Sequence, residues 1–145
     1  MIIAVDFDGT IVEHRYPEIG KEIPFAIATL KQLQAERHIL ILWTVREGKL
    51  LDDAVEYCRS RGLEFYAVNA NHPDELPQEN PSCPCRKLRA DLFIDDRNVG
   101  YLPDWGAIYE MVKRKISSRR YYREMYQDYV EEKPSFWKRV FGGKR

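Results

Sequence analysis

The sequence predicts an α/β protein in which a mainly parallel sheet lies between helices on both of its faces. Short runs of consecutive apolar residues recur at 2–5, 39–43, 65–68 and 92–94, as expected for strands buried on both faces. Segments with apolar residues at helical spacing lie between and after these runs. Alternating strands and helices are typical of parallel α/β sheets. The length of 145 residues is sufficient for one hydrophobic core.

The first half of the chain contains two predicted strand–helix units. The first strand covers 2–5, and a polar segment at 13–21 follows it. Pro24 is expected to open the first helix, because proline is favoured in a first helical turn. The second strand covers 38–44, and the helix after it is expected to end at Gly62, because glycine favours the backbone conformation that follows a helix.

The second half begins with a short strand at 65–68 and a long loop. Residues 69–86 contain four prolines and three asparagines, and a loop of this length inside a compact domain is often functional. A fourth strand covers 92–94, and a helix is expected at 105–116.

Charge divides the chain into two parts. The net charge is zero, but residues 113–145 hold 11 Lys/Arg against 4 Asp/Glu, so the rest carries the opposite excess. We therefore predict a domain at 1–116 and a helical basic tail at 117–145. One face of a continuing tail helix is expected to pack on the domain or on a second copy, through Tyr122, Met125, Tyr126 and Tyr129. A less favoured alternative is contact of the 136–145 segment with nucleic acid or an anionic membrane.

Composition excludes several other classes. The longest apolar stretch, 39–45, is too short for a membrane-spanning helix. Three unevenly placed cysteines do not predict a disulfide framework, so a cytoplasmic protein is expected. Cys83 and Cys85 with His72 could be a zinc site, but the fourth ligand is missing, since Cys58 is better explained as a core residue.

The carboxylates that follow two of the predicted strands are the main chemical signal. Asp6 and Asp8 follow the first strand, and Asp95 and Asp96 follow the fourth. If these strands are neighbours, the four side chains converge and repel one another unless a cation neutralises them. Oxygen ligands without His or Cys favour Mg²⁺. The alternative is that these residues only cap helices or form turns.

These residues resemble motifs of the haloacid-dehalogenase-like (HAD) phosphatases and phosphotransferases. The resemblance covers residues 2 to about 112, and it rests on Asp6-Phe7-Asp8-Gly9-Thr10-Ile11-Val12, Thr44, Lys87 and Ile94-Asp95-Asp96. It implies a HAD-like, Rossmann-like three-layer sandwich. The segment 13–21 is long enough for a flap but too short for a folded cap domain. The 69–86 loop is also too short for a cap domain, so a capless protein is expected. Such an open site predicts a large substrate, or a partner or homo-oligomer that closes it.

The resemblance also implies catalytic roles. Asp6 would be the nucleophile that forms an aspartyl-phosphate. Asp8 would protonate the leaving alcohol and then deprotonate the attacking water. Thr44 and Lys87 would bind the phosphoryl oxygens. The dehalogenase branch of the family lacks the second aspartate, so Asp8 favours phosphoryl chemistry.

The same resemblance implies a magnesium site and a substrate site. Mg²⁺ would be bound by Asp6, Asp8, Asp95 and Asp96, with the backbone carbonyl as the Asp8 ligand and Asp96 as the direct ligand of the second pair. The substrate-binding group would be Gly9, which permits a tight turn, with Thr44, Lys87 and Arg46. For Arg46 a contact with substrate and a pairing with Glu47 or a surface carboxylate both stay open. Arg97 is expected to pair with the acidic cluster.

The predicted function is that of a Mg²⁺-dependent hydrolase, a phosphatase acting on a phosphate monoester. A nucleic-acid-end phosphatase is one alternative, because Ile94-Asp95-Asp96-Arg97 also resembles the phosphatase module of polynucleotide kinase-phosphatases. A non-catalytic binding or assembly module on the same scaffold, with the basic tail as its contact, is the other.

Overall fold

The described residues of the first 106 positions contain a four-stranded parallel sheet. The computed structural model describes residues 1–75 and 88–132. The sheet has the order β3-β2-β1-β4, with β1 at Ile2–Val5, β2 at Ile39–Leu42, β3 at Ala67–Val68 and β4 at Leu92–Ile94. Every pair of neighbouring strands is parallel. The predicted α/β class and parallel sheet are confirmed, and the arrangement is compatible with a Rossmann-like sandwich.

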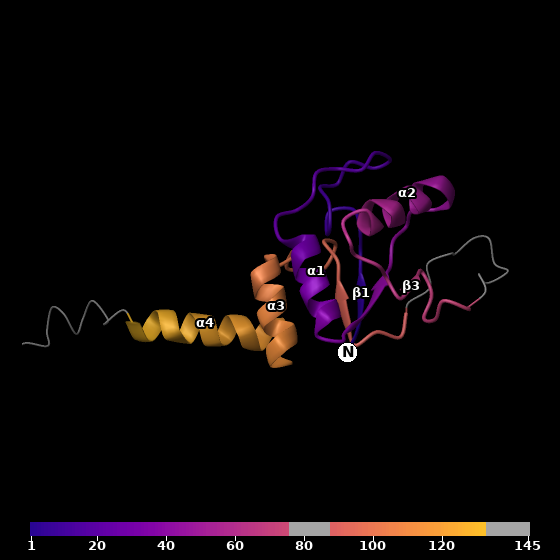
Figure 1. Ribbon diagram of the computed structural model, residues 1–145. Coiled ribbons are helices and arrows are strands. Elements are labelled where there is room, and N and C mark those ends of the chain that lie inside the picture. The colour runs from indigo at the N-terminus through magenta and orange to yellow at the C-terminus, as the bar shows by residue number, and fades with distance from the viewer. Residues whose placement is uncertain (76–87, 133–145) are drawn as a thin grey trace, which may run out of the picture. The chain divides into compact units, whose positions relative to one another are not determined.

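The described residues also form four helices, which Figure 1 draws as coiled ribbons. They are α1 at Ala26–Ala35, α2 at Gly48–Arg59, α3 at Trp105–Arg114 and α4 at Ser118–Glu132. In the part of the chain that the structure describes, no helix is both long and apolar enough to cross a membrane.

Two helix boundaries differ from the predictions for the same physical reason. The residue before α1 is Phe25, whose φ of 68° is left-handed, so the helix begins after Pro24 rather than with it. Lys115 has a φ of 51°, and it ends α3 before Ile116. The tail helix α4 is therefore a separate helix and not a continuation of α3.

Strand register brings three loops to one edge of the sheet. Val5 pairs with Leu42 on one side and with Ile94 on the other. Because these strands are parallel and end level with one another, the residues that follow them share the carboxyl edge of the sheet. Ligands bind at this edge in open α/β sheets.

The core occupies both faces of the sheet. On one face Ala4, Ile41 and Ala67 form a buried cluster with Leu88, a residue outside the strands. Alternation along the strands places the other buried strand residues on the opposite face, namely Ile3, Val5, Leu40, Leu42 and Ile94. Cys58 on α2 is fully buried, as predicted, and burial raises the pKa of its thiol to about 12.

The chain divides into two compact units after Gly106, within α3. The expected domain at 1–116 and tail at 117–145 stay a prediction. In the second unit Glu124 accepts hydrogen bonds from Arg120 and Arg114, which lower its pKa.

The predicted tail surface is described only in part. Met125 is 52% exposed and Tyr126 is 66% exposed. Packing of this face on the domain or on a second copy stays a prediction. The side chain of Tyr129 and the 136–145 segment lie outside the described residues.

Candidate active site

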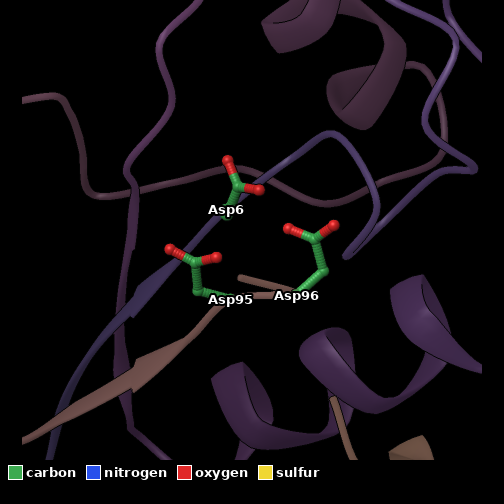
Figure 2. A group of neighbouring side chains, drawn as sticks. All are labelled: Asp6, Asp95 and Asp96. Carbon is green, nitrogen blue, oxygen red and sulfur yellow. The ribbon is translucent and has the colours of Figure 1, made fainter. Parts of the chain in front are cut away.

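Three carboxylates meet at the carboxyl edge of the sheet. Asp6 follows β1, and Asp95 and Asp96 follow β4. One carboxylate oxygen from each residue lies within 4.8 Å of the other two, and Figure 2 shows the three side chains grouped above the strand ends. The expected convergence of the two strand ends is therefore present for these three residues.

A threonine joins the two halves of this group. The Asp96 backbone N–H donates a hydrogen bond to Thr10 Oγ1 over 3.0 Å. The Thr10 hydroxyl in turn donates to Asp6 Oδ2 over 3.5 Å. Thr10 thus links the loop after β1 to the loop after β4. Thr10 belongs to the 6–12 motif, from which this bridging role was not predicted.

Gly9 allows Asp96 to approach the loop after β1. Its φ of +85° is a conformation that favours glycine, which agrees with the predicted tight turn. A Cβ atom at this position would lie 2.2 Å from Asp96 Oδ2. Gly9 is therefore needed both for the turn and for the place of the Asp96 carboxylate.

The electrostatics of the group are unfavourable without a cation. Burial raises the pKa of Asp6 from its ordinary value of 3.8 to about 7, and the charges of Asp95, Asp96 and Asp8 add to this effect, against a hydrogen bond from the Phe7 backbone. Asp96 Oδ1 is buried and has no hydrogen-bond partner among the described residues. Clustered carboxylate oxygens with one buried, unpaired oxygen fit a hard divalent cation such as Mg²⁺.

Asp8 occupies a different environment from the other three carboxylates. Its carboxylate accepts two hydrogen bonds from Arg46, from Nε to Oδ2 and from Nη2 to Oδ1, both over 2.7 Å. The four carboxylates were expected to gather around one cation, but the Asp8 carboxylate is paired with a buried arginine instead. Only its backbone carbonyl is left as the metal ligand that the resemblance implies.

The structure also corrects the expectation for Arg46. Its side chain is 0% exposed, and besides Asp8 it donates to the carbonyl oxygens of Pro17 and Glu18 over 2.9 and 2.8 Å. Neither a contact with substrate nor a pairing with Glu47 or a surface carboxylate describes this environment. The pairing could not be read from local sequence, because the two residues are 38 positions apart.

Thr44 is held by an asparagine that sequence reasoning missed. Asn69 follows β3, and its side-chain amide accepts from the Thr44 N–H over 2.8 Å and donates to the Thr44 carbonyl over 2.9 Å. Thr44 is 2% exposed and follows β2, as predicted. The available signal was an asparagine directly after a third predicted strand, a position that shares the edge with Thr44.

A cleft of about 350 Å³ lies at the carboxyl edge of the sheet. Its volume is at the lower end of the range for small-molecule sites. Asp6, Asp8, Thr44 and Asp95 are among its lining residues. The polar segment 13–21, which we call the flap, contributes His14 and Tyr16, and further walls come from Trp43, Val45 and Arg97. In Figure 1 the flap lies in the indigo loop that projects beyond β1.

Two cationic residues, Lys87 and Arg97, were expected near the acidic group. Lys87 lies outside the described residues, so its phosphate-binding role stays a prediction. Arg97 was expected to pair with the acidic cluster. Its backbone N–H donates to Asp95 Oδ1 over 2.8 Å, and the residue lines the cleft.

The alternative zinc site is not assembled by described residues. His72 is exposed and forms an ion pair with Asp74 over 3.4 Å, and Cys58 is buried in the core. Cys83 and Cys85 lie outside the described residues.

Comparison with known proteins places the chain in a conserved family. No protein-family model and no curated protein matches it. A solved structure, that of the conserved protein coded by a locus from Bacteroides thetaiotaomicron, is 68% identical in sequence, with a TM-score of 0.73. The match covers 81% of this chain and 93% of that protein. The chain belongs to the family of this conserved protein, whose name states no activity.

Proposed function

We propose that the protein is a Mg²⁺-dependent phosphatase that hydrolyses a phosphate monoester through an aspartyl-phosphate on Asp6. The proposal includes a HAD-like three-layer fold without a cap domain. The observation that carries it is the group of Asp6, Asp95 and Asp96, of which Asp6 and Asp95 line the cleft. Asp96 Oδ1 is buried without a hydrogen-bond partner among the described residues.

The three grouped carboxylates would hold the magnesium ion. The resemblance adds the backbone carbonyl of Asp8 as a fourth ligand. When bound, the ion neutralises the charge of the site and reduces the repulsion between a carboxylate and a phosphate. Thr10 and Gly9 support the group, since Thr10 bridges Asp6 and the Asp96 backbone and Gly9 leaves room for the Asp96 carboxylate.

Asp6 is the nucleophile in this mechanism. A carboxylate oxygen of Asp6 forms a bond to phosphorus while the bond from phosphorus to the leaving oxygen breaks. Thr44 borders the same cleft and would bind an oxygen of the transferred group. The charge of that group would be stabilised by Lys87, as the resemblance implies, and by Arg97 from the wall of the cleft.

Asp8 is the proposed acid and base. It would give a proton to the leaving oxygen in the first step. In the second step it would take a proton from the water that attacks phosphorus, and the bond to Asp6 then breaks and releases phosphate. Its place in the cleft lining supports this role.

Hydrolysis of p-nitrophenyl phosphate tests the proposal. We expect turnover with Mg²⁺, none with a chelator, and a loss of roughly 10⁴-fold or more in Asp6→Asn, as is found when a nucleophile is removed. Asp52→Asn, which changes an exposed carboxylate on α2, is the matched control and should retain full activity. Activity in Asp6→Asn would exclude Asp6 as the nucleophile.

A further inference from the structure

Arg46 connects three parts of the site that are far apart in sequence. Two of its hydrogen bonds go to the Asp8 carboxylate, and two go to the carbonyl oxygens of Pro17 and Glu18 in the flap. Its backbone N–H donates to Thr44 Oγ1 over 3.3 Å. A single buried side chain therefore contacts the proposed acid and the flap, and its own backbone contacts the proposed phosphate ligand.

Two aromatic rings complete the environment of the guanidinium. Its central carbon lies 5.2 Å from the centre of the Phe7 ring and 5.3 Å from the centre of the Tyr16 ring. Phe7 is fully buried, whereas Tyr16 is half exposed and lines the cleft. The flap residue that can touch a leaving group thus packs on the arginine that holds Asp8.

The geometry of this arginine is restrictive. A guanidinium paired with both oxygens of a carboxylate fixes the rotation of that carboxylate, which a lysine cannot do. A carboxylate has about four acceptor positions, and Arg46 fills two of them on Asp8, so positions remain for a substrate or water. The flap carbonyls are bound to the same rigid, planar group.

We propose that Arg46 is a positioning residue that couples the flap to Asp8. The proposal rests on the function proposed above. Arg46 holds the flap and the Asp8 carboxylate as one unit. In this proposal the flap contacts the leaving group, and the Asp8 carboxylate exchanges a proton with the leaving group. Arg46 itself does not contact the substrate.

Two substrates of similar shape separate this role from a general structural one. Phenyl phosphate has a poorer leaving group than p-nitrophenyl phosphate, so its hydrolysis depends more on proton transfer to the leaving oxygen. We expect Arg46→Lys to lower kcat for phenyl phosphate roughly 10-fold more than for p-nitrophenyl phosphate, and Asp8→Asn to show the same selectivity. Arg59→Met, which breaks an exposed ion pair with Glu56, is the control and should change neither value.

Amide hydrogen exchange tests the coupling without any substrate. The Glu13 N–H, which donates to the Lys21 carbonyl over 2.8 Å, closes the base of the flap. We expect its exchange to be at least several-fold faster in Arg46→Lys and in Asp8→Asn, and unchanged in Arg59→Met. If Arg46→Lys does not fold, exchange of the Glu13 N–H in Asp8→Asn still tests the coupling, because this substitution removes the charged partner of the Arg46 guanidinium.

The outcomes separate this inference from the proposed function. Equal losses on the two substrates, or unchanged exchange of the flap in folded variants, would overturn the coupling. If the wild-type protein hydrolyses neither substrate with Mg²⁺, the proposed function fails, and the exchange result alone decides whether Arg46 joins the flap to Asp8.

Discussion

Two carboxylates of one short motif, Asp8 and Asp6, have opposite electrostatic environments. Asp8 is paired with Arg46 through two hydrogen bonds of 2.7 Å. Asp6, only two residues earlier, lies instead among Asp95 and Asp96, and burial raises its pKa to about 7. Arg46 neutralises and orients the Asp8 carboxylate, whereas Asp96 Oδ1 is buried without a hydrogen-bond partner among the residues that the structure describes. This difference indicates that the chain itself balances the charge of Asp8, while the group of Asp6, Asp95 and Asp96 requires a cation.

The largest effect is expected when the partner of Asp8 is removed, in contrast with removal of one carboxylate from the group of Asp6, Asp95 and Asp96. We expect Arg46→Met to lower the free energy of unfolding by about 3–5 kcal/mol, because it leaves the Asp8 charge buried without its partner. Asp95→Asn should leave the metal-free protein at pH 8 as stable as wild type or more stable, because it removes one of three like charges. Urea denaturation without Mg²⁺ measures both. Equal destabilisation by the two substitutions would contradict the division.

The pH dependence of stability tests the electrostatics of Asp6. The folded-state pKa of Asp6 lies near 7 and its ordinary value is 3.8. Between these values the folded protein binds a proton that the unfolded chain does not, so the stability of the metal-free protein falls as the pH rises through this window. The expected loss is about 2–4 kcal/mol.

The same pH titration of stability has two controls, one with Asp6→Asn and one with added Mg²⁺. Asp6→Asn should lose the part of the pH dependence that lies between about pH 4 and 7. Saturating Mg²⁺ should restore stability above pH 7, because an ion that binds only the folded protein stabilises it. A pH profile that is identical in wild type and Asp6→Asn would show that Asp6 is not the perturbed group.

A smaller effect on stability is expected when Gly9 is replaced by alanine, and Gly48 offers a matched control. Gly9→Ala would place a methyl group 2.2 Å from Asp96 Oδ2, at a φ of +85°, so it should weaken Mg²⁺ binding by roughly 10-fold and cost about 1–3 kcal/mol in stability. Gly48→Ala also changes a residue with a positive φ, +51°, but nothing lies within 4 Å of its Cβ position. It should therefore leave Mg²⁺ binding unchanged. Calorimetric titration with Mg²⁺ compares the two.

The sequence was sufficient for the parts of the site that depend on strand order. The apolar runs predicted β1 and β4, and their ends placed Asp6, Asp95 and Asp96 at one edge once these strands paired. The start of α3 at Trp105 was predicted. Periodicity did not predict where α1 begins or where α3 ends, because those limits depend on left-handed residues, Phe25 and Lys115, that no composition rule marks.

Contacts between distant loops could not be predicted. Two such contacts are the ion pair of Asp8 with Arg46 and the hydrogen bonds between Asn69 and Thr44. Both depend on side-chain positions that exist only after the loops have packed. A local reading treated Arg46 as a substrate or surface residue, since arginine is seldom fully buried. The partners of buried polar side chains at the carboxyl edge of the sheet are therefore the contacts that a sequence motif does not predict.

The most direct test of the central claim is to trap the phosphorylated protein. Wild-type protein is mixed with Mg²⁺ and a slowly hydrolysed phosphate monoester, quenched in acid within the turnover time, digested and analysed by mass spectrometry. The account predicts one added phosphoryl group on Asp6, present only with Mg²⁺ and absent in Asp6→Asn. Turnover with a phosphoryl group on another residue, or with none, would contradict it.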